Sequence, residues 1–175
     1  MTLGNIGRAS YRDFAGKRKL LIVPYVTPTR DNEHLHEMVR TYWTDAFAQV
    51  RKLEASLGGV RYLFHEGFVG EEQETDEILE AGNPHGYVEL KAIIERGAEL
   101  KPTEDVGCLK ETLDLHRCMS VVKDSHTVAE RLSQWFEESR TARYAAIAGN
   151  IDRYLKENEL AVLVISPDHE VKFAE

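Results

Sequence analysis

Apolar residues gather in three short, continuous runs that are separated by long stretches with helical periodicity. The runs span 19–26 (KLLIVPYV), 60–64 (VRYLF) and 160–165 (LAVLVI). Each run is rich in β-branched and aliphatic residues and ends at polar or turn-forming residues, which predicts a buried strand. Pro24 falls inside the first run. Because proline cannot donate to a strand ladder, we expect this strand to lie at a sheet edge or to bulge there.

The strongest helical pattern follows the first run, where apolar residues recur at three- and four-residue steps up to Leu57. Asp31 or Asn32 can cap this helix, and Gly58-Gly59 ends it. Shorter helices are expected within 70–80 and from Tyr87 to Gly97, and a largely helical stretch from 106 to 157 with an interruption near 123–127. The last part of that stretch carries a stripe predicted to be core: Tyr144, Ile147, Ala148, Ile151, Tyr154 and Leu155.

Strands that are apolar throughout and alternate with long helices are typical of a parallel sheet covered on both faces. The sequence therefore predicts an α/β fold, with a small, mostly parallel sheet of three or more strands flanked by long helices in three layers. Because a three-stranded sheet is small, we expect a further strand among the segments interpreted as helical, or a second copy of the chain that completes or covers the sheet. We expect residues 1–18 to form a basic N-terminal arm and residues 19–175 a single α/β domain.

The composition narrows the classes of partner and compartment. The net charge of −8 repels phosphate backbones, so we expect no nucleic-acid partner. Without a signal-peptide core or an apolar run of about 20 residues, we expect a cytoplasmic protein that is not bound to a membrane. Cys108 and Cys118 lack the spacing of a zinc site and are expected to be buried thiols. Gly67 and Gly70 fit no phosphate-binding motif, so no nucleotide cofactor is predicted.

Ligands of open parallel sheets bind beyond the carboxyl ends of the strands. Side chains that can bind a metal ion follow all three apolar runs: Glu33, His34 and His36 after the first, His65 and Glu66 after the second, and Asp168 and His169 after the third. Imidazole together with carboxylate is a ligand set that zinc, manganese and iron accept. Water bound to such an ion loses a proton near neutral pH, and a nearby carboxylate can act as general base, so the set would support hydrolysis.

The same residue types also have a structural interpretation. Asp, Asn, Ser and Thr at strand-to-helix junctions are what helix caps and turns require, and a histidine in a loop is common without any ligand role. We expect surface or packing roles for His85, His116 and His126, which lie in turn or helical stretches. Trp43 and Trp135 occur at helical spacing with aliphatic partners, which predicts core packing.

With these strand ends the chain resembles a shortened, divergent member of the TraB/ChaN/Tiki superfamily. Members carry G-x-x-H after the first strand, an acidic residue after the second, an arginine in a late helix and another G-x-x-H after a late strand. The corresponding stretches here are Asp31-x-x-His34, His65-Glu66, Arg143 within SRTARYAAIAGNIDRYL, and Ser166-x-x-His169, with Asp31 and Ser166 at the positions of the two glycines. The segment 139–173, about a fifth of the chain, matches best. The resemblance implies a metal-dependent hydrolytic or ligand-binding pocket, as in Tiki-like members, or haem or iron handling, as in ChaN-like members.

Two hypotheses of function follow from the sequence. The first is a metal-dependent hydrolase acting on an unknown small molecule or peptide. In this hypothesis His34, His65, Glu66 and His169 supply ligands for a divalent ion (Zn, Mn or Fe), Glu33 or Asp168 is the general base, and Arg143 steadies an anionic substrate. The second is a non-catalytic α/β module, homodimeric or otherwise oligomeric, that binds a small ligand or another protein.

Overall fold

The structure, a computed structural model, describes residues 16–30, 32–70, 75–122 and 124–173. Its elements in chain order are β1 (Lys19–Pro24), α1 (Glu33–Leu57), β2 (Val60–His65), α2 (Thr75–Gly82), α3 (Tyr87–Glu95), β3 (Glu99–Leu100), α4 (Val106–Val121), α5 (His126–Tyr154) and β4 (Leu160–Ile165). Asn32 caps α1, because its side-chain oxygen accepts hydrogen bonds from the backbone N–H groups of His34 and Leu35, and Gly58 ends the helix. Asp31 and most of the basic segment, including Arg8 and Arg12, lie outside the described residues.

The four strands form one parallel sheet in the order β1-β4-β2-β3. This confirms the predicted α/β class, and β3 is a further strand beyond the three apolar runs. Right-handed crossovers through helices are how parallel neighbours are connected, which is why long helical segments separate the strands in sequence. The three apolar runs became neighbouring strands, with β4 paired to both β1 and β2.

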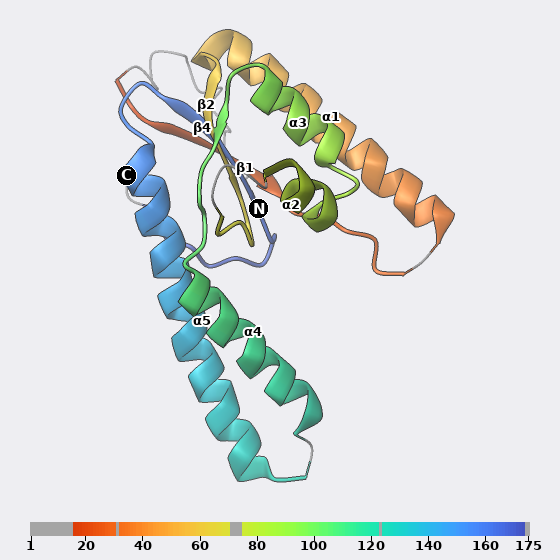
Figure 1. Cartoon of the computed structure of the whole chain (residues 1–175), viewed down its shortest axis with the longest axis vertical. Coiled ribbons are helices and arrows are strands. Elements are labelled where there is room, and N and C mark those ends of the chain that lie inside the picture. The colour runs from red at the N-terminus through yellow and green to blue at the C-terminus, as the bar shows by residue number, and fades with distance from the viewer. Residues whose placement is uncertain (1–15, 31, 71–74, 123, 174–175) are drawn as a thin grey trace, which may run out of the picture.

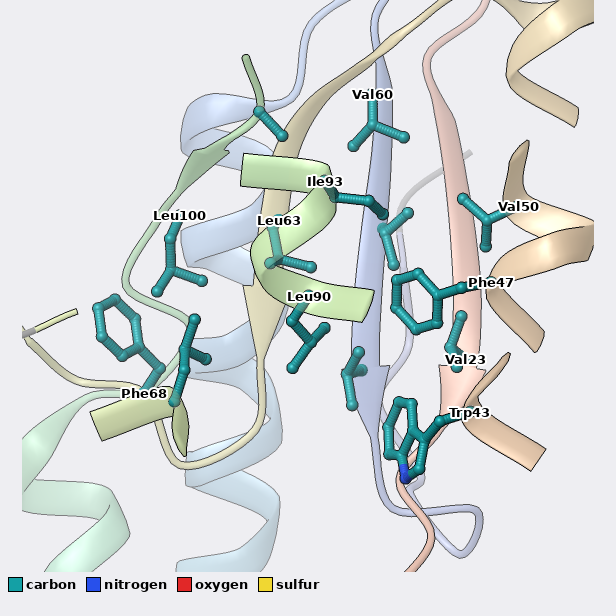
Figure 2. Close-up of a cluster of buried hydrophobic side chains, with 14 of the residues drawn as sticks. Val23, Trp43, Phe47, Val50, Val60, Leu63, Phe68, Leu90, Ile93 and Leu100 are labelled. Atoms are coloured by element: carbon teal, nitrogen blue, oxygen red, sulfur yellow. The ribbon is translucent and has the colours of Figure 1, made fainter. Parts of the chain in front are cut away.

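Helices cover both faces of the sheet, giving the predicted three layers (Figure 1). On one face, α1 and α3 pack over the strands, and Figure 2 shows Trp43, Phe47 and Val50 of α1 meeting Leu90 and Ile93 of α3 there. On the other face, the C-terminal part of α5 covers β2 and β4. Its buried residues belong to the predicted stripe, which is confirmed as core: Ile147, Ile151 and Leu155 are at most 2% exposed.

β1 is an edge strand, as Pro24 predicted. Lys19 N–H donates to Glu159 O and Tyr25 N–H to Ile165 O, both toward β4. Since backbone groups alternate in direction along a strand, the backbone groups of the even-numbered residues, Pro24 included, face away from β4. The missing N–H of Pro24 therefore costs no bond in the sheet.

The α4–α5 hairpin, made of α4 and the N-terminal half of α5, projects away from the sheet (Figure 1). Its helices bury few side chains against each other: Thr112, Leu132 and Ser139. Trp135 is 52% exposed on this hairpin, so its predicted core role is wrong. The prediction of buried thiols is also wrong, because Cys108 is half-buried and Cys118 is exposed. For Trp135 the cause is that helical periodicity predicts an apolar face without showing what covers it, and the described residues leave this side chain half exposed.

Arg18, at the end of the basic segment, forms an ion pair with Asp152 of α5 at 2.6 Å. None of the helices in the described ranges has the length and apolar character needed to cross a membrane.

Candidate functional site

The carboxyl ends of β2 and β4 carry a compact ion-pair cluster, which we call the rim cluster: Glu66, Glu104 and Arg143. Arg143 comes from α5, Glu66 from the residue after β2, and Glu104 from the segment before α4. Arg143 Nε lies 3.0 Å from Glu104 Oε2, and Arg143 Nη2 lies 3.0 Å from Glu66 Oε1. The three side chains are 12%, 16% and 0% exposed for Arg143, Glu66 and Glu104. The cluster is therefore a largely dry site in which one cation faces two carboxylates.

Backbone groups complete the coordination of both carboxylates. Glu66 Oε2 accepts a hydrogen bond from Ser166 N–H at 2.6 Å, and Glu104 Oε1 accepts one from Gly67 N–H at 3.2 Å. Burial alone lowers the pKa of Arg143, but its hydrogen bonds and ion pairs with Glu104 and Glu66 outweigh burial and raise that pKa overall. The cluster thus connects the ends of β2 and β4, the start of α4 and the middle of α5 through charges that satisfy one another.

His65 lies beside this cluster in sequence but on the opposite face of the sheet. It is 5% exposed, and its ring nitrogens contact the Glu66 carbonyl oxygen at 2.7 Å and Asn83 Nδ2 at 3.2 Å. The ring also packs edge-on against Tyr25, and burial lowers the pKa of His65. Asn83 is itself fully buried. A ring whose two nitrogens both have protein partners holds Asn83 in place, and it is not presented to a ligand.

The remaining predicted site residues lie apart from the rim cluster's contacts. His34 is exposed in the first turn of α1, and the 85%-exposed side chain of Glu33 forms an ion pair with Arg40. After β4, Asp168 is exposed, and His169 Nδ1 accepts a hydrogen bond from Val171 N–H at 3.3 Å. Of the seven predicted site residues, the side chains that the structure joins directly are those of Glu66 and Arg143.

A metal site built mainly from protein ligands needs three or more of them around one point. Throughout the described ranges, no group of three or more His, Cys, Asp or Glu side chains is arranged so that it could hold an ion. In the rim cluster, both oxygens of Glu66 are already bound, by Arg143 and by Ser166 N–H. The metal site at the strand ends stays a prediction from the sequence.

A second group of titratable side chains forms where α1 and the turn before α3 meet. His36 Nδ1 lies 2.8 Å from His85 Nε2, and the ring centroids are 4.9 Å apart. The pKa of His85 is lowered by its partial burial, and further by the nearby His36 and Arg40. The sequence placed His36 among the residues after the first strand, but it assigned His85 to the surface or to packing and did not predict the contact.

Glu104 and Asn83 are two of the buried polar residues that sequence reasoning missed. An acidic residue just before a helix is typical of a capped N-terminus, and Asn-Pro is typical of a turn, so both have a common explanation in sequence. The property that distinguishes these two residues is their burial in the fold. A single sequence does not show whether an isolated polar residue is buried.

By its fold and by this site, the chain is a parallel three-layer α/β protein whose carboxyl rim is closed by an ion-pair cluster. Comparisons with protein-family models, curated proteins and solved structures found no match. The resemblance to the TraB/ChaN/Tiki superfamily therefore stays a prediction.

Proposed function

We propose that this chain is a non-catalytic α/β module that associates with a second copy of itself through the open edge of its sheet. The observation that carries the proposal is the pattern of β1 backbone groups that have no strand partner in the part of the chain that the structure describes. Leu20 and Ile22 direct their N–H and C=O groups away from β4, and no strand in the described part of the chain pairs with them. An edge of this kind pairs readily with another strand.

At the C-terminal end of β1, Pro24 limits which residues of this edge can pair with a second strand. Pro24 has no N–H, and its carbonyl oxygen accepts a hydrogen bond from the Tyr42 hydroxyl at 2.7 Å. The groups left for a partner are those of Leu20 and Ile22. Two antiparallel copies of β1, with Leu20 of each opposite Ile22 of the other, would form four hydrogen bonds around a two-fold axis.

The surface beside the edge is apolar, as a stable interface requires. A groove of about 540 Å³ lies between β1 and α1. The α1 wall repeats at helical spacing, through Tyr42, Ala46, Gln49 and Leu53. Leu53 is 40% exposed on this face of the sheet, and Ile22 is 44% exposed on the other. Pairing of two edges would bring the two α1 helices together and remove this apolar surface from water.

The rim cluster supports a non-catalytic role. Its carboxylates and guanidinium bind one another and the backbone, and the buried polar side-chain atoms of the described residues all have hydrogen-bond partners. A binding or catalytic site usually keeps some polar groups ready for its ligand. Here the polar groups fasten the sheet to α4 and α5.

The oligomeric state of the full chain tests the proposal. Sedimentation velocity should find a dimer whose dissociation constant rises at least tenfold in Ile22→Lys, because a charge at the edge opposes strand pairing. Val121→Lys is the matched control: Val121 is 75% exposed at the far end of α4 and should leave the dimer intact. A monomer at all concentrations, or equal weakening by both substitutions, would rule out the β1 interface.

A metal-dependent hydrolase acting on a small molecule or peptide is a second candidate, favoured by the contact between Glu66 and Arg143. These are the acidic residue and the late-helix arginine that the family resemblance brings together. This candidate requires hydrolysis that depends on added Zn²⁺, Mn²⁺ or Fe²⁺ and is lost in His169→Ala. Hydrolysis that persists in His169→Ala, or none with any of the three ions, would remove it.

A further inference from the structure

We propose that His36 and His85 form a two-imidazole binding site for a divalent transition-metal ion. The site uses His36, which follows the first strand, but none of the four ligands of the hydrolase hypothesis, and it does not depend on the proposed dimer. It rests on the contact between two rings that lie 49 positions apart in the chain and come from different elements.

The distance between the ring nitrogens fits a shared ion. Zinc binds imidazole nitrogens at about 2.0–2.1 Å, so two nitrogens on one tetrahedral ion lie roughly 3.3 Å apart. His36 Nδ1 and His85 Nε2 are 2.8 Å apart. An opening of roughly half an ångström, with both rings turned so that the two nitrogens point at one position, would replace the hydrogen bond between the rings by a shared metal ion.

The backbone holds both histidines in place. His36 lies in the first turn of α1, where its N–H donates to Asn32 O at 3.0 Å. His85 precedes Gly86, whose N–H donates to the buried Asn83 Oδ1 at 2.9 Å. Ligands that are already oriented lose little freedom when an ion binds, which favours affinity.

The chemistry of the pair selects the class of ion. Imidazole is a good ligand for zinc, copper and nickel and a poor one for magnesium and calcium, which prefer oxygen. Arg40 acts electrostatically on His85, but its guanidinium is bound by the Glu33 carboxylate at 2.8 Å, which offsets part of its charge. Two protein ligands leave the other coordination positions to water, so we expect an exchangeable ion.

Titration of the metal-stripped, untagged full chain with Co²⁺, followed by visible absorption, and with Zn²⁺, followed by calorimetry, tests this site. We expect one ion per chain and at least a tenfold loss of affinity in His36→Ala and in His85→Ala. His126→Ala is the control, because His126 is a histidine at the start of α5 whose side chain is 88% exposed and which has no ligand role in either hypothesis. Mg²⁺ should not compete.

The outcomes separate this site from the others. Unchanged affinity in both variants, or no binding of Co²⁺ and Zn²⁺ by the unmodified chain, would overturn the proposal. Loss of binding in His169→Ala alone would assign the ion to the strand ends and also count against it. As a check on folding, Zn²⁺ should raise the thermal midpoint of the unmodified chain and of His126→Ala, but not those of His36→Gln and His85→Gln.

Discussion

Single residues decide how the carboxyl rim holds together, and Arg143 has the central position among them. Its guanidinium contacts Glu104, whose side chain is 0% exposed, and Glu66, which in turn binds the backbone N–H of Ser166 directly after β4. Removing one partner of a buried ion pair leaves a charge without compensation, which costs far more than the pair itself contributes. The rim cluster should therefore be sensitive to loss of its cation.

We predict that Arg143→Met lowers the free energy of unfolding by about 3 kcal/mol, the cost of leaving a buried carboxylate unpaired. The midpoint of urea unfolding, measured with an unchanged slope, reports this loss. Arg140→Met is the control three residues away on α5, since Arg140 is 28% exposed and pairs with the exposed Glu137 and Glu170. The control should change stability by less than about 1 kcal/mol. Equal effects would mean that the rim cluster is no more than a surface network.

The burial of His65 predicts how stability depends on pH. Burial lowers the pKa of His65 from its ordinary value of 6.5, so the unfolded chain binds this proton more tightly than the folded chain. The contribution of His65 to the free energy of unfolding is therefore full above pH 6.5. It falls as the pH drops below 6.5 and becomes constant once the pH is below the pKa of the buried ring. In His65→Gln, urea unfolding at pH 7.5 and pH 5.5 should give a smaller decrease than in the unmodified chain. A His65→Gln variant that keeps the full decrease would contradict the assignment.

At this scale the sequence predicted residue types better than contacts. Glu66 and Arg143 were both named as site residues, and the structure joins them. Glu104, the most deeply buried member of the rim cluster, was not predicted as a site residue. A carboxylate just before a helix is explained locally as part of the helix start and needs no tertiary contact. The contact of His36 with His85 depends on how α1 meets α3, which no local spacing encodes.

At the level of the elements, Gly86 at the N-cap of α3 and Gly149 inside α5 differ in whether the packing requires glycine. A Cβ atom on Gly86, the N-cap of α3, would lie 2.7 Å from Trp43 Cδ2 and 2.8 Å from Asn83 Nδ2. A Cβ atom on Gly149, inside α5, would meet nothing within 4 Å. Close packing of α3 on α1 thus requires glycine at the first position, while α5 does not require it at the second.

We predict that Gly86→Ala lowers the free energy of unfolding by about 1–3 kcal/mol through overpacking against Trp43. Gly149→Ala should raise it by about 0.5–1 kcal/mol, because alanine favours the helix. Thermal or urea unfolding of the two variants measures the expected decrease in stability for Gly86→Ala and the expected increase for Gly149→Ala. A neutral Gly86→Ala would show that the junction of α1 and α3 can relax, and would weaken the view that it orients His85 rigidly.

The elements themselves were largely predictable, because long periodic or continuous apolar stretches specify them. The ranges of α1, β2 and β4 agree closely with the sequence prediction. β3 has two residues, too few for any strand pattern, and is fixed by its pairing with β2. Trp135 fits the helical pattern equally well but is exposed, since periodicity defines a face and only tertiary structure can cover it.

At the scale of the whole molecule, the sheet is protected unevenly. β4 lies in the interior of the sheet and is buried along its full length, while the outer edge of β1 has no strand partner among the described residues. The sequence predicted a small sheet that a second copy could complete, and the direction of each N–H along β1 adds a specific register to that prediction.

Amide hydrogen exchange of β1 at two protein concentrations is the most direct test of this account. If two chains pair along β1, the N–H groups of Leu20 and Ile22 should exchange at least tenfold more slowly at the concentration where sedimentation finds the dimer. Those of Leu21 and Val23, which face β4, should not change. Exchange of Leu20 and Ile22 at the same rate at both concentrations would contradict association through this edge.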